Sequence, residues 1–122
     1  MKNLTIGVLG LGLFGTSVAR TLAENNIDVI AMDKNMDHVA EVVEEVAVAV
    51  QGDFTKIDQL AEAGFGDCTE VVIASAERLE NSIVAILNLL KLGVEDITVK
   101  TKNIDYRDVL LKVGATRVIL PE

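Results

Sequence analysis

Three glycines with the spacing G-x-G-x-x-G follow an apolar run near the start of the chain, and they are Gly10, Gly12 and Gly15. Residues 4–9 have the composition of a short buried strand, and residues 16–22 have the apolar spacing of a helix. The glycines therefore lie where a strand passes into a helix, the setting of a phosphate-binding turn. There the first glycine allows a tight turn, the second lets the backbone approach a pyrophosphate, and the third lets helix and strand pack closely. The phosphates would lie at the positive N-terminal end of the helix.

An acid ends the second predicted strand, residues 28–33. This acid, Asp33, follows Gly12 by 21 residues. The dinucleotide-binding fold places an acid against the ribose hydroxyls at an interval of about 20 residues. The spacing therefore predicts ribose contact at Asp33, and we include the neighbouring Lys34 in the site. The alternative is that Asp33 caps the helix that begins near Met36, since Asp and Asn are common N-caps.

A polar loop follows the third predicted strand, residues 47–51. Its sequence is Gly52-Asp53-Phe54-Thr55. Because the strands are expected to be parallel, this loop lies at the same edge of the sheet as the glycine turn, where an adenine would bind. The alternative is that Asp53 and Thr55 only cap the next predicted helix, residues 56–63.

Small residues follow the fourth predicted strand, residues 70–74. They are Ala74, Ser75 and Ala76. Small side chains at the carboxyl end of a strand leave room for a ligand in the crevice, although a tight connection would require the same residues. Two further side chains receive structural interpretations: His38 is alone on a predicted helix and is expected at the surface, and Cys68 is expected to be a structural thiol.

The remaining elements continue an alternation of strands and helices. Strands are predicted at residues 4–9, 28–33, 47–51, 70–74, 96–100 and 117–120, and helices at 16–24, 37–46, 56–63, 79–92 and 104–113. This alternation predicts an α/β fold with a Rossmann-like doubly wound sheet of six parallel strands and helices on both faces. The helix at 79–92 is apolar around most of its circumference, so another subunit is expected to cover the face that the sheet does not.

Composition excludes several classes of function. A chain of 122 residues forms one domain and is too short for a two-domain dehydrogenase. The net charge of −8 argues against general attraction to nucleic acid or anionic membrane. The densest apolar segment, residues 83–92, falls short of the roughly 20 residues that cross a bilayer. A single cysteine excludes an internal disulfide and a cysteine metal cluster.

Four segments together resemble the N-terminal nucleotide-binding domain of RCK proteins, also called the KTN or TrkA-N domain. They are GLGLFG, the acid in AMDKN, GDFTK and the closing VGATRVILPE, and the resemblance extends over residues 4–122. Such domains belong to cytoplasmic regulators of potassium channels and transporters, and the KtrA/KtrC type of subunit is the most similar. The second domain that usually follows in these proteins is expected to be missing from this chain.

The resemblance implies an adenine nucleotide (ATP, ADP or AMP) or NAD(H) as ligand, without chemistry performed on it. It implies phosphate contacts at Gly10, Gly12, Leu13, Phe14 and Gly15, ribose contact at Asp33, and adenine near Asp53, Phe54 and Thr55. Lys100 matches a basic position that approaches the phosphates, and Glu122 matches an acid that helps to hold a cation near ATP. The implied partners are a membrane potassium transporter subunit and further copies of the chain, as a dimer or a ring of dimers.

Two positions depart from the family pattern. Leu13 replaces an arginine of the KtrA glycine loop, and a leucine cannot pair with a terminal phosphate. Ala74, Lys100 and Lys102 stand where calcium-regulated members have acids, which disfavours a calcium site. The alternatives to a regulatory domain are the cofactor module of an NAD-dependent oxidoreductase and a free nucleotide sensor. The oxidoreductase would need a substrate domain and an acid–base residue facing the nicotinamide, and the sequence provides neither.

Overall fold

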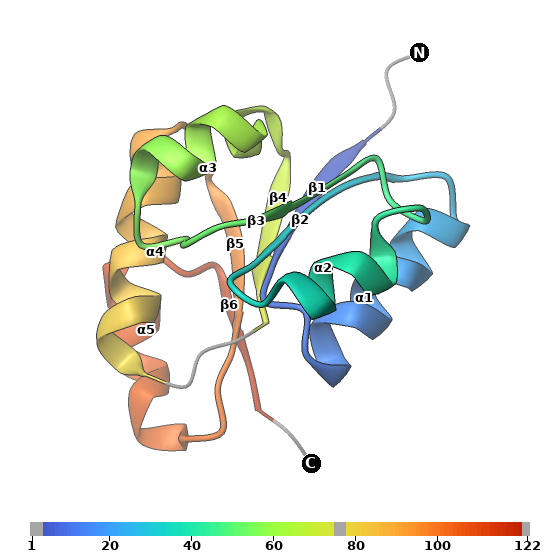
Figure 1. Ribbon diagram of the computed structural model, residues 1–122. Helices are drawn as coiled ribbons and strands as arrows, with labels where there is room; N and C mark the ends of the chain where they lie inside the picture. Colours follow the sequence, from blue (N-terminus) through green and yellow to red (C-terminus); the bar gives the residue numbers. More distant parts are fainter. Residues whose placement is uncertain (1–3, 75–77, 121–122) are drawn as a thin grey trace.

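The chain forms one sheet with helices on both faces, as the computed structural model shows for residues 4–74 and 78–120 (Figure 1). The strands are β1 (Thr5–Leu9), β2 (Asp28–Asp33), β3 (Val48–Gln51), β4 (Glu70–Ile73), β5 (Asp96–Lys100) and β6 (Arg117–Ile119). The helices are α1 (Leu13–Glu24), α2 (Met36–Val42), α3 (Ile57–Ala63), α4 (Leu79–Lys91) and α5 (Arg107–Val113), with short 3₁₀ helices η1 (Phe65–Asp67) and η2 (Ile104–Tyr106).

All six strands are parallel and lie in the order β3-β2-β1-β4-β5-β6. This confirms the predicted doubly wound fold. The chain winds outward from β1 in one direction to β3 and in the other from β4 to β6. The connections therefore separate at the carboxyl ends of β1 and β4, which in this class of fold is the place for a ligand crevice.

Two hydrophobic clusters hold the helices on the sheet. On one face Val8 and Val29 pack with Ala19 of α1 and Val39 of α2. On the other face the larger cluster joins the sheet to Leu60 of α3, Leu89 of α4 and Leu110 of α5. Figure 1 shows the same division, with α1 and α2 on one side of the sheet and α3, α4 and α5 on the other. The central strands are buried on both faces, which explains their continuous apolar sequence.

Helix α4 is only half covered by the domain. Ala85, Ile86 and Leu89 are fully buried against the sheet. On its other side Val84, Leu87 and Leu90 are 38%, 44% and 38% exposed. The nearly all-round apolar composition therefore corresponds to one buried and one exposed face. Within residues 4–74 and 78–120, no helix has both the length and the apolarity needed to cross a bilayer.

Three predicted helix limits are wrong. Helix α1 begins at Leu13, three residues earlier than predicted, because the glycine motif forms its first turn. Helix α2 ends at Val42 rather than at residue 46; a run of acids there opposes the negative C-terminal end of the helix dipole. The predicted helix 104–113 begins as η2, since the side chain of Asn103 accepts a hydrogen bond from the Asp105 N–H and tightens the first turn.

Candidate nucleotide-binding site

The glycine turn has the geometry that its sequence predicts. Gly10 has a φ of +95°, a conformation that favours glycine. A Cβ on Gly15 would collide with the carbonyl oxygen of Gly10, so α1 reaches the turn only without a side chain there. A Cβ on Gly12 would meet nothing within 4 Å. Backbone conformation explains Gly10 and packing within the domain explains Gly15, whereas Gly12 leaves its space open to an incoming ligand.

The first turn of α1 offers backbone donors to this open space. Gly12 is the N-cap residue, no side chain caps the helix, and no acidic residue lies in the first turn. The leading N–H groups of a helix have no partner inside it, and together with the helix dipole they attract anions. Leu13 is the first residue of the helix and is 96% exposed. Because its side chain is apolar, it adds no charge to this end of the helix.

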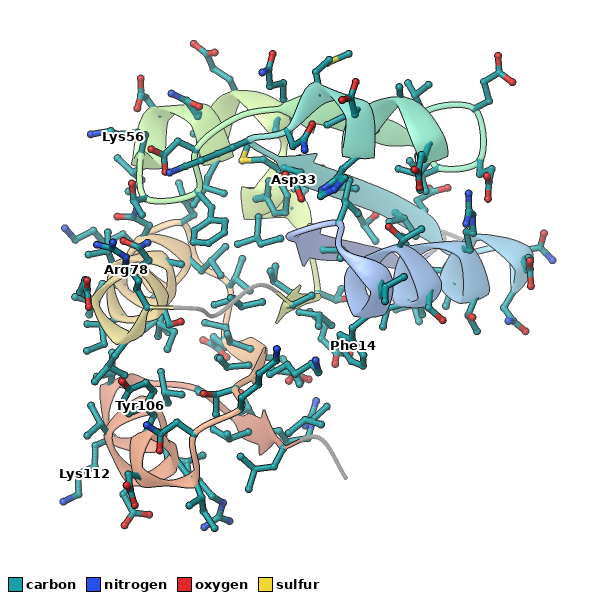
Figure 2. The ribbon with its side chains drawn as sticks, turned by 60° about the horizontal axis from the view of Figure 1, so that its bottom comes forward. Phe14, Asp33, Lys56, Arg78, Tyr106 and Lys112 are labelled. Atoms are coloured by element: carbon teal, nitrogen blue, oxygen red, sulfur yellow. The ribbon has the colours of Figure 1, made fainter. Side chains whose placement is uncertain are left out.

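Asp33 lies beside the glycine turn at the end of β2 (Figure 2). Its Oδ2 accepts a hydrogen bond from the Leu11 N–H at 2.6 Å, and its Oδ1 accepts one from the Asn35 N–H at 2.8 Å. Burial raises the pKa of this carboxyl, but the two backbone hydrogen bonds outweigh it and the pKa lies below its usual value. The N-cap of α2 is Asn35, so the alternative role of Asp33 as that cap is wrong.

His38 contacts the same carboxylate, which the sequence did not predict. Its Nδ1 lies 3.2 Å from Asp33 Oδ2, and its side chain is 41% exposed. The expected surface position of His38 is therefore correct, but the sequence did not indicate that the side chain lies beside Asp33. Helix α2 begins three residues after β2 ends, so its first turn folds back over the strand end. The short connection with a capping Asn35 is the signal that would have indicated this contact.

An open groove of about 660 Å³ extends from the glycine turn along α1 and α2. It includes Gly12 and Leu13 at one end, and His38 and Glu41 of α2 along one side. Arg20, on the α1 side, forms an ion pair with Glu45 at 2.9 Å. The groove therefore runs from the first turn of α1 to His38, the residue that contacts Asp33.

The loop after β3 is built around Asp53. Its Oδ1 accepts hydrogen bonds from the Thr55 N–H at 2.9 Å and the Thr55 hydroxyl at 2.7 Å. Burial raises the pKa of Asp53, but these bonds and nearby lysines lower it below its usual value. The N-cap of α3 is Lys56 and has no side-chain hydrogen bond, so Asp53 and Thr55 order their own loop and do not cap the helix.

Tertiary folding brings Lys34 and Asp53 together. Lys34 Nζ lies 3.7 Å from Asp53 Oδ2, which links the ends of β2 and β3 beside Asp33. Phe54 instead packs, partly buried, against the core on the α3–α4 face, and its carbonyl accepts a hydrogen bond from Asn88. The loop thus presents Asp53 and Thr55 at the carboxyl edge of the sheet, while Phe54 anchors it.

On the far side of the glycine turn, Lys100 lies over the ring of Phe14, with its Nζ 4.9 Å from the ring centroid. Ala74 is half-buried, and its Cβ would lie 3.1 Å from a Cβ on Gly15. Ala74 thus lies close to the start of α1, and both the ligand-crevice and the tight-connection interpretations of its small size stay open. Ser75, Ala76 and Glu122 of the predicted site lie outside the described residues.

Two other side-chain predictions concern structure and metal binding. Cys68 is buried, and burial raises the pKa of its thiol to about 12, which fits a structural role. Within the described parts of the chain, no three His, Cys, Asp or Glu side chains gather as metal ligands would.

A doubly wound sheet with a glycine turn, an open helix N-terminus and an acid at the end of β2 defines a Rossmann-type nucleotide-binding domain. The family model of the TrkA-N domain matches residues 6–121, and the chain belongs to this family. This confirms the resemblance that the sequence motifs indicated.

Three known proteins illustrate the similarity. Ktr system potassium uptake protein C of Bacillus subtilis (strain 168) is 39% identical over 115 residues, covering 94% of this chain and 52% of that protein. The structure of the GsuK channel bound to NAD matches with a TM-score of 0.80 at 18% identity, over 97% of this chain and 21% of that one. The Kef CTD of Shewanella denitrificans in its AMP-bound form also has a TM-score of 0.80 at 18% identity, over 96% of this chain and 71% of that one. The chain spans about half the length of the curated relatives it matches.

Proposed function

We propose that this chain is the nucleotide-binding regulatory domain of a potassium transport system. The observation that carries the proposal is the pairing of an ionised, hydrogen-bonded Asp33 with the open first turn of α1. This pairing suits an adenosine ribose and its phosphates. The family membership and the similarity to Ktr potassium uptake proteins support the transport role.

The ligand that we propose is an adenine nucleotide or NAD(H). NAD and AMP, which are bound in two structures of the same fold, both contain adenosine monophosphate. Asp33, the glycine turn and the Asp53–Thr55 loop are the parts of this chain that would receive that shared portion. Asp33 lies between the other two, at the end of β2.

We propose that the domain acts by binding and not by catalysis. A nucleotide that binds one arrangement of the assembled subunits more tightly shifts the equilibrium toward it, by its differential affinity and no more. A membrane potassium transporter on whose cytoplasmic side the subunits assemble would read out that shift. The polar groups at this site are donors and acceptors suited to holding a ligand: backbone N–H groups, Asp33 and Asp53.

The experiment is to identify the nucleotide. The purified protein is denatured, the released small molecules are identified by mass spectrometry, and ATP, ADP, AMP, NAD and NADH are titrated calorimetrically. We expect an adenine nucleotide or NAD(H) bound at one per chain, with NADH left unoxidised by candidate substrates. Failure of all five ligands to bind would contradict the proposal, and steady NADH turnover would revive the oxidoreductase alternative.

We further propose that the exposed face of α4 joins two copies of the chain. Val84, Leu87 and Leu90 form this face, and a second subunit is the natural cover for an apolar helix surface. Leu87→Glu is expected to convert the assembly to monomers in sedimentation velocity, with monomer stability changed by no more than about 0.5 kcal/mol. Val43→Glu, at an exposed apolar residue beyond α2, is the matched control and should leave the assembly intact. A wild-type protein that stays monomeric at high concentration would contradict this arrangement.

A further inference from the structure

Phe14 and Lys100 come from elements on opposite sides of β4. Phe14 lies in the first turn of α1, which follows β1 through the glycine turn, and Lys100 is the last residue of β5. Because β4 lies between β1 and β5 in the sheet, the contact between the two side chains spans the carboxyl end of β4. Figure 2 shows Phe14 and Asp33 on opposite sides of the start of α1. The pair therefore lies at the end of the candidate site that is away from the ribose acid.

The first turn of α1 carries no charged side chain of its own. The net charge of the chain is −8, and Leu13 brings no charge to the first turn. The helix N-terminus supplies about half a unit charge, which falls off within one turn. Arg20 and Lys34 are paired with Glu45 and Asp53 on the other side of the turn. A phosphate chain that continues beyond the first turn of α1 would therefore meet Lys100 as its nearest cation among these side chains.

We infer that Phe14 is a positioning residue, which holds the Lys100 ammonium where it reads the number of phosphates on the bound nucleotide. This inference rests on the proposed function. An ammonium is attracted to the face of an aromatic ring, but only weakly where the pair is partly exposed. A phosphate accepts a stronger, charge-assisted hydrogen bond, which the amine can donate while it stays over the ring. The ring thus restricts a flexible lysine before the ligand arrives, and the ordering required on binding is smaller.

If the Phe14 ring positions Lys100, it raises the affinities of AMP, ADP and ATP by different amounts. AMP places its single phosphate at the first turn of α1 and gains little from Lys100. ADP and ATP extend further and gain more with each added phosphate. A ring that only packs against its neighbours would instead affect all three nucleotides to the same extent. The ratio of the ATP and AMP affinities therefore separates positioning from packing.

The experiment measures the affinities of AMP, ADP and ATP for the full-length protein by calorimetry, without divalent cations and at fixed salt. Phe14→Leu is expected to lower the ATP-to-AMP affinity ratio by about two- to fivefold and to change AMP binding by less than twofold. Phe14→Trp, which keeps an aromatic face, should retain the ratio. Lys100→Met should lower the ratio by about tenfold, and adding Phe14→Leu to it should cause no further loss. Lys102→Met, at a neighbouring exposed lysine, is the matched control and should leave the ratio unchanged.

Proton NMR of the wild-type protein gives a second test that does not depend on the folding of Phe14→Leu. The methylene protons beside the Lys100 amine should be shifted upfield by the ring in the free protein, and they should stay shifted upfield when ATP binds. Equal weakening of AMP and ATP by Phe14→Leu, or Lys100 methylene protons that lose their upfield shift when ATP binds, would overturn the inference. If no adenine nucleotide binds the wild-type protein, the proposed function itself fails. Binding of all three with an unchanged ratio in Phe14→Leu refutes only the role of Phe14.

Discussion

The two ends of the candidate site are built by different means. At the ribose end, Asp33 is held by backbone N–H groups of Leu11 and Asn35 and contacts His38. At the phosphate end, Leu13 is exposed and uncharged, and the nearby cation, Lys100, rests on the ring of Phe14. Backbone hydrogen bonds form with the fold itself, whereas Lys100 is held only by a weak contact with an aromatic ring. This difference predicts a rigid receptor for adenosine and an adjustable one for the phosphate groups attached to it.

The largest expected effect is on protein stability, and it distinguishes Gly15, which the fold requires, from Gly12, which we expect to contact the ligand. Gly15→Ala forces a Cβ into the Gly10 carbonyl oxygen, and we expect it to destabilise the protein by about 3 kcal/mol or more. Gly12→Ala meets open space and should change the free energy of unfolding by no more than about 0.5 kcal/mol. Urea denaturation measures both.

Gly12→Ala also tests where the phosphates of the ligand bind. Gly12→Ala places a methyl group where the backbone is expected to approach phosphates, so nucleotide affinity should fall by about tenfold or more although the fold is intact. Unchanged calorimetric affinity in a folded Gly12→Ala protein would place the phosphates elsewhere.

Removing the ribose acid should have the next largest effect. Asp33→Ala takes away the acceptor for the ribose hydroxyls, and we expect adenine-nucleotide binding to weaken by at least about tenfold. It also leaves the Leu11 N–H without its acceptor, with a loss of stability of about 1–3 kcal/mol. Calorimetry and urea denaturation measure the two effects. Asp58→Asn, at an exposed acid in the first turn of α3, should leave nucleotide affinity unchanged.

A smaller effect is expected at His38, which contacts Asp33 from a half-exposed position. A partly exposed side-chain contact of this kind contributes about 0.2–1 kcal/mol, so His38→Ala should change nucleotide affinity by no more than about fivefold. His38→Gln, which keeps a hydrogen-bonding group, should recover most of the difference. A loss as large as that of Asp33→Ala would mean that the ribose end depends on His38 as much as on its backbone donors.

The smallest expected effect is a dependence of stability on pH. The pKa of Asp33 is lower in the folded protein than its ordinary value of about 3.9. A lowered folded-state pKa adds stability that is fully present above the unfolded-state pKa and is lost as the pH falls through the folded-state pKa. Wild-type protein should therefore lose more stability than Asp33→Asn between about pH 5 and pH 2 in urea denaturation series. Parallel curves for the two proteins would show that Asp33 contributes nothing to acid sensitivity.

The glycine turn and helix α2 differ in how well the sequence predicts their structure. The turn was predicted in detail because each role of Gly10 and Gly15 depends on neighbouring backbone. The end of α2 was misplaced by four residues, since the apolar spacing continues after the hydrogen bonding has stopped. The ligand contacts of Gly12, Asp33 and Asp53 stay predictions, because they depend on a molecule that the chain does not itself specify.

By itself, the sequence determined the alternation of strands and helices, the glycine turn and the interval that brings Asp33 to the end of β2. All of these depend on short-range periodicity and backbone conformation, which neighbouring residues decide. Only the tertiary structure decided that His38 meets Asp33, that Lys34 meets Asp53 and that Lys100 reaches Phe14. These contacts depend on strand order and helix packing, which bring separate segments together in a way that no single segment encodes.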